Sequence, residues 1–155
     1  MTKRLVVLVF AALAVYGGVK WRGHHAAAAD ESAPALDRLW IDHLPANPRD
    51  EISVFVALSD EPMGIFQTAS QWRGKYELFQ HETNGEELRI VYPATGERES
   101  VRVRARKCDD NGWDYCLELK GASRGVKRYY SMEGWDVGST DAASSLMRRV
   151  FATGK

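Results

Sequence analysis

The chain has 155 residues, 45% of them hydrophobic and 27% charged, which is typical of one soluble globular domain and excludes a chain that is disordered throughout. Its formal net charge is zero, from 21 basic and 21 acidic residues. Four of the cations precede Asp30, the first acidic residue, so the remainder holds 17 basic and 21 acidic residues. Because proteins bind nucleic acids by neutralising phosphates, this acidic remainder predicts no nucleic-acid partner.

Residues 1–29 are predicted to be an export signal or signal anchor with a linker. Lys3 and Arg4 precede an apolar run over residues 5–19, which is long for the core of a signal peptide and shorter than the ~20 residues that span a bilayer. The signal is either cleaved near the alanines at 26–29 or kept as an anchor that holds the chain in the membrane through residues 5–19. In both cases we expect an exported domain, either periplasmic or extracellular, or anchored at the membrane surface.

Residues 30–50 are predicted to form a short amphipathic helix and a linker. Leu36, Leu39 and Trp40 recur at helical spacing, and a serine before them and a proline after them suit the two ends of a helix over residues 32–45.

Residues 51–155 are predicted to form a β-meander domain with a C-terminal helix. Alternating apolar residues, as in "ISVFVAL" (52–58) and "EELRIVYP" (86–93), indicate six to seven antiparallel strands. No crossover helix separates them, as a parallel sheet would require. The expected fold is therefore mainly β, a barrel-like or half-open sheet.

The last segment, "STDAASSLMRRVFATGK", places its apolar residues on one face of a helix, which predicts packing against the sheet. Arg148 and Arg149 lie opposite that face, so a helix that binds a membrane or a partner is the alternative.

Cys108 and Cys116 are the only two cysteines. Alternation places both on the polar faces of adjacent predicted strands, and the Asp-Asp-Asn-Gly sequence between them is typical of a hairpin turn. Pairing Cys108 with Cys116 sets Arg106 opposite Glu118 and Arg104 opposite Lys120. A thioredoxin-like pair would have two residues between the thiols, and a zinc site would need two more ligands nearby. We therefore predict a structural disulfide and no metal site.

Two surface features suggest binding. Arg102, Arg104 and Arg106 alternate with apolar residues and would form a basic stripe on the solvent face of one strand. Trp113 follows the turn between the cysteines, where it either anchors a partner or folds back over the sheet.

No catalytic pattern is recognisable. Of the four histidines only His81, beside Glu82, falls in the predicted sheet, and no nucleophile elbow, phosphate-binding loop or zinc-protease motif occurs. The sequence predicts no catalytic residue and no cofactor.

The helix–meander–helix layout, with Trp72-x-Gly74 in "QWRGKYEL", resembles the lipocalin or calycin family, whose first strand carries Gly-x-Trp. The resemblance implies a barrel with a cavity for a small apolar ligand. It also implies that a late basic residue packs across the tryptophan, a place that Arg128, with Tyr130 on the same side of its strand, would take here.

We therefore expect a non-catalytic envelope or secreted binding module for a small apolar ligand. The alternative is an interaction subunit of a membrane-anchored envelope complex, which would bind an envelope protein. An enzyme of unknown class is the third hypothesis.

Overall fold

The structure, a computed structural model, describes residues 34–153. The predicted export signal or anchor over residues 1–29 lies outside this range. Within the range, no helix is both long enough and apolar enough to cross a membrane.

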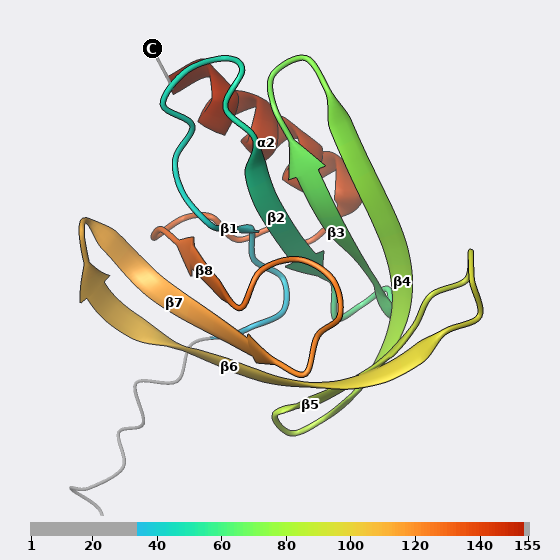
Figure 1. The fold of residues 1–155 in the computed structure, drawn as a ribbon. Helices are drawn as coiled ribbons and strands as arrows, with labels where there is room; N and C mark the ends of the chain where they lie inside the picture. The colour runs from blue at the N-terminus through green and yellow to red at the C-terminus, as the bar shows by residue number, and fades with distance from the viewer. Residues whose placement is uncertain (1–33, 154–155) are drawn as a thin grey trace, which may run out of the picture. The chain divides into compact units, whose positions relative to one another are not determined.

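Eight antiparallel strands form one ringed sheet, as the mainly β prediction requires (Figure 1). Each strand pairs with its neighbours along the chain, and β1 also pairs with β8, which closes the ring. The strands are β1 (Trp40–Ile41), β2 (Ile52–Ala57), β3 (Met63–Ala69), β4 (Gly74–Asn84), β5 (Glu87–Val91), β6 (Arg98–Asp110), β7 (Trp113–Lys120) and β8 (Arg128–Ser131). The predicted count of six to seven strands was too low, because β1 was not recognised.

The prediction of a short helix over residues 32–45 was wrong for the residues that the structure describes there. The segment from residue 34 contains bends and the strand β1. Leu39, Trp40 and Ile41 are all 0% exposed, and Trp40 belongs to a different core cluster from its two neighbours. Successive side chains of a strand point to opposite faces, so a strand can bury both faces here, whereas an amphipathic helix would bury one.

The barrel core lies on the inner face of the sheet, and a second core lies outside it. The outer core packs the apolar outer side chains of β1 and β2 against α2 (Thr140–Thr153), which crosses behind β2 and β3 in Figure 1. Ala143, Leu146 and Val150 are the buried residues of the helix, which confirms the predicted C-terminal packing helix. The Ser139 hydroxyl caps the helix by accepting a hydrogen bond from the backbone N–H of Ala142.

Cys108 and Cys116 form the predicted disulfide, with Cα atoms 5.7 Å apart. The turn between β6 and β7 is Asn111-Gly112, whose φ angles of 52° and 87° are those that asparagine and glycine tolerate best. The predicted register was wrong by two residues, because a bulge between Lys107 and Asp110 shifts the pairing. The disulfide is compatible with an exported protein.

Candidate functional site

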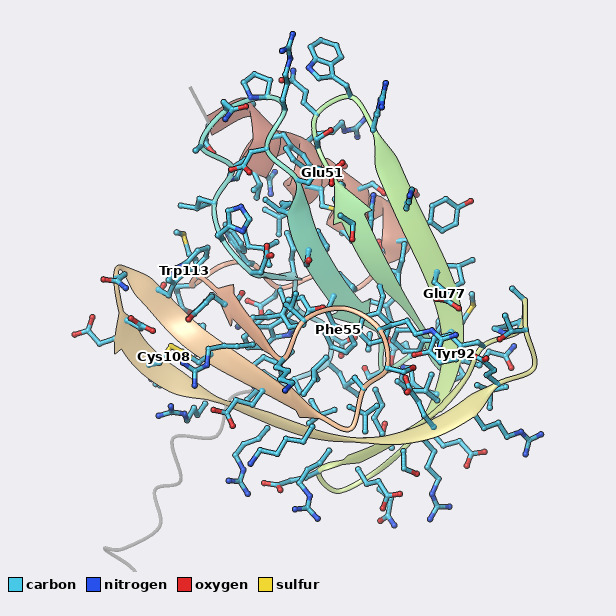
Figure 2. The ribbon with its side chains drawn as sticks, in the orientation of Figure 1. Glu51, Phe55, Glu77, Tyr92, Cys108 and Trp113 are labelled. Carbon is cyan, nitrogen blue, oxygen red and sulfur yellow. A yellow bond between two sulfur atoms is a disulfide. The ribbon has the colours of Figure 1, made fainter. Side chains whose placement is uncertain are left out.

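The middle of the barrel, where the resemblance implies a ligand cavity, is occupied by aromatic side chains. Phe55, Phe66, Phe79 and Tyr129 are each at most 4% exposed. Their neighbouring ring centroids lie 5.1–6.0 Å apart, the spacing of packed aromatic pairs. Figure 2 shows Phe55 within this layer. A ligand at this position would have to displace the rings.

A charged network around Arg124 and Tyr92 lies next to this aromatic layer. The Arg124 guanidinium lies 4.2 Å from the centroid of the Tyr92 ring, and it donates hydrogen bonds to Glu97 and, over 3.1 Å, to Glu77. Tyr92 and Glu77 lie close together in Figure 2. The Tyr92 hydroxyl donates to Glu99. Burial raises the pKa of Tyr92, and this hydrogen bond adds to the effect. Each polar group of the network therefore has a hydrogen-bonding partner within it. This arrangement indicates a structural role.

His81 faces inward from β4 and is 5% exposed. Its Nε2 lies 3.0 Å from the carbonyl oxygen of Leu58. Burial lowers the pKa of His81, which favours the neutral ring. Glu82 is exposed and points to the other face of the strand, so the sequence neighbours do not form an acid–base pair. Among residues 34–153, no group of three or more histidine, cysteine or acidic residues is placed to hold a metal ion.

The outer face of β5–β8 carries a dense set of cations, which we call the arginine face. Its exposed members come from four adjacent strands: Arg89, Arg98, Arg102, Arg104, Arg106, Lys120 and Arg128. The sequence predicted the central three of them, Arg102, Arg104 and Arg106, because they alternate with Val101, Val103 and Ala105, which are buried.

Only part of the arginine face is neutralised by carboxylates. Arg104 pairs with Glu86 at 3.4 Å, Arg89 with Glu87 at 3.6 Å and Arg128 with Glu118 at 3.3 Å. Within the described range, the remaining members make no ion pair: Arg98, Arg102, Arg106 and Lys120. Arg102 lies directly across from Lys120, where the sequence register had placed Arg104. These two cations, together with Glu86 and Glu87, line an open cleft of about 600 Å³.

Trp113 folds back over the sheet and does not project from the hairpin. Its ring stacks on Tyr130 with centroids 5.4 Å apart and meets the edge of Trp135 at 5.9 Å. Trp113 is half-buried and packs against the outer core. Of the two predicted placements, this is the one in which the ring folds back over the sheet. Tyr130 points outward from β8, so it does not line the barrel interior.

Trp72 and Arg128 are not brought together as the resemblance implied. Trp72 lies in the turn between β3 and β4 and is 72% exposed. Arg128 lies on the outer face of β8 and pairs with Glu118 on β7.

Sequence reasoning missed a second exposed surface, on β3 and β4. Tyr76 is 68% exposed and Leu78 is 45% exposed, both on the outer face of β4. Their alternation with Glu77 and Phe79 indicated a strand, but alternation alone does not say which face is buried.

Comparison with protein-family models, with curated proteins and with solved structures finds no match to this chain. The class that the structure defines is a mainly β protein with an eight-stranded ringed sheet, one outer helix over the described range, a hairpin disulfide and a cationic outer face.

Proposed function

We propose that this protein is a non-catalytic binding module of the cell envelope, which holds an acidic partner protein on its arginine face. The observation that carries the proposal is the set of four exposed cations without ion pairs on adjacent strands, in a chain whose formal net charge is zero. Like charges directly opposite one another in a sheet destabilise it, as at Arg102 and Lys120; on the other side of Arg102, the opposite residue is Glu87 of β5, which itself pairs with Arg89. An acidic partner would remove that repulsion.

Arginine suits this role because its planar guanidinium can bind a carboxylate through two parallel hydrogen bonds. On the arginine face the unpaired arginines Arg98, Arg102 and Arg106 extend along the single strand β6. An extended acidic segment laid along β6 would meet them in turn. Association should be fast and strongly weakened by salt, since exposed charges are screened within about 8–10 Å at physiological ionic strength.

The alternative proposal is a small apolar ligand inside the barrel. It requires the aromatic layer around Phe55 and Phe79 to open, because those rings are in packing contact. Native mass spectrometry of the purified protein distinguishes the two proposals, since a tightly held ligand would add its mass to the chain.

The test uses a fluorescein-labelled peptide of ten glutamates as the probe, with fluorescence anisotropy as the readout. We expect the full chain to bind the peptide, and we expect Arg102→Glu combined with Arg106→Glu to weaken binding at least tenfold. The matched control is Arg148→Glu combined with Arg149→Glu, which makes the same charge change on exposed positions of α2. Equal weakening in both variants, or no binding by the unaltered chain, would contradict the proposal.

A further inference from the structure

Five large apolar side chains are exposed on the described surface. They lie on the loop after β1, at the start of β3, in the β3–β4 turn and on the outer face of β4: Leu44, Met63, Trp72, Tyr76 and Leu78. Trp72 and Tyr76 are the most exposed, at 72% and 68%. The arginine face carries none of these five residues, so the two surfaces differ in chemistry as well as in position.

The turn that carries Trp72 lies at one end of the barrel beside the loop between β1 and β2 (Figure 1). The backbone N–H of Gln71 donates a hydrogen bond to the carbonyl oxygen of Pro48 in that loop, at 3.2 Å. From the turn, β4 continues with Tyr76 directly across from Gln67 of β3. The result is a protruding hairpin end with two aromatic side chains, which we call the aromatic tip (Trp72, Arg73, Lys75 and Tyr76).

The aromatic tip is positively charged. Arg73 and Lys75 are exposed and both follow Trp72 in the chain, and neither makes an ion pair within residues 34–153. No acidic residue occurs between Glu61 and Glu77, and the Glu77 carboxylate is held by Arg124 at 3.1 Å. The carboxylate nearest to the tip in sequence is therefore already neutralised. Beside the turn, the segment that follows Pro48 adds one exposed cation, Arg49, and one exposed carboxylate, Glu51.

We propose that the aromatic tip docks on an anionic lipid bilayer. Tryptophan and tyrosine prefer the headgroup level, because one end of each ring is apolar and the other forms hydrogen bonds. Arg73 and Lys75 would meet lipid phosphates, and each basic residue near an anionic bilayer adds to binding. The tip is the end of a hairpin, which suits a lipid surface better than it suits a folded partner with a protruding anchor.

The sequence outside the described range argues for the same occupant. The apolar run over residues 5–19 is separated from residue 34 by 14 residues, 20–33. Fully extended, 14 residues reach about 50 Å. If the run is kept as an anchor, the domain stays within that reach of lipid, where even weak docking is populated because of the high effective concentration. Since the arginine face lies on other strands, lipid and an acidic partner can be bound together.

The test uses the full chain reconstituted into nanodiscs that contain phosphatidylcholine and phosphatidylglycerol. An environment-sensitive nitrobenzoxadiazole label is attached at Gln71→Cys, which is exposed and leaves Trp72 in place. The matched control places the label at Asn84→Cys, at the opposite end of β4. The native cysteines are joined in the disulfide, so each variant carries one label. Brominated lipids quench a label only if it contacts the bilayer.

We expect quenching at position 71 to be at least threefold stronger than at position 84. We also expect Trp72→Ala, or Lys75→Glu, to reduce the quenching at position 71 by at least half, and phosphatidylcholine alone to reduce it similarly. Equal quenching at both positions would show unspecific adsorption and overturn the proposal. Absence of quenching would also overturn it, and a blue shift that grows with protein concentration would then assign the tip to a second copy of the chain.

Discussion

Replacing Gly64 by alanine tests directly whether the barrel interior is filled. Gly64 lies on β3 opposite Phe79 of β4. A Cβ at this position would lie 2.1 Å from Phe79 Cζ, 2.4 Å from Phe79 Cε2 and 2.7 Å from the carbonyl oxygen of Val56. Phe79 cannot easily turn away, because Phe66 lies 5.1 Å from it on one side. The carbonyl oxygen of Val56 is part of the sheet backbone, so it can move even less than the Phe79 ring.

Overpacking a close-packed core typically costs about 1–3 kcal/mol. The cost of Gly64→Ala should lie near the upper end of this range, because the new methyl group would clash both with the Phe79 ring and with the backbone oxygen of Val56. For a domain of this size each kcal/mol lowers Tm by about 3–5 °C, so we expect a decrease of about 6–15 °C. Gly138→Ala is the matched control: its Cβ would have no heavy atom within 4 Å, and its effect should stay within about 0.5 kcal/mol.

Thermal unfolding followed by circular dichroism measures both variants. The Gly64→Ala/Phe79→Leu double variant should be more stable than the sum of its single changes by about 1 kcal/mol, because leucine frees the space that the new methyl group needs. If Gly64→Ala unfolds at the same temperature as Gly138→Ala, the barrel has room for Phe79 to move. The argument against a ligand cavity then fails, and the small-ligand proposal gains support.

Three further predictions concern the disulfide and two buried titratable groups. Cys108→Ser with Cys116→Ser should lower the free energy of unfolding by about 2.5 kcal/mol, the loop-closure value for nine residues; an unchanged urea midpoint would contradict this. Burial lowers the pKa of His81 in the folded state, so the unfolded chain binds more protons and stability should fall as pH drops below about 6.5. His81→Phe should show a shallower decline in urea midpoints between pH 7.5 and 5.5, and parallel curves would refute the assignment. Burial raises the pKa of Tyr129 to about 12 and also raises the pKa of Tyr92, so an absorbance titration should contain a late transition whose amplitude falls by one tyrosine in Tyr129→Phe.

The positions of most strands follow from local alternation. On β6, Val101 and Val103 are buried while Arg102 and Arg104, which alternate with them, are exposed, because successive side chains of a strand point to opposite faces. The same period predicted the central residues of the arginine face. Local turn chemistry at Asn111-Gly112 predicted the hairpin that brings the two cysteines together.

The register within that hairpin was not predictable from alternation. A slip by two residues leaves every side chain on its original face, so the hydrophobic pattern fits both registers equally well. The bulge between Lys107 and Asp110 selected one of them, and it moved Arg104 from Lys120 to Glu118. The charge pairing of the arginine face therefore depended on the folded structure.

The sequence by itself determined a mainly β chain with a hairpin disulfide, a C-terminal packing helix and a basic stripe, since each of these depends on residues close together in the chain. Only the tertiary structure decided that Trp40–Ile41 forms β1, because burial on two faces comes from α2 and the barrel interior, which are distant in sequence. It alone decided that Phe55 and Phe79 fill the barrel while Trp72 is exposed. An aromatic residue carries the same local pattern in a core and on a surface, and what distinguishes the two is the long-range packing around it.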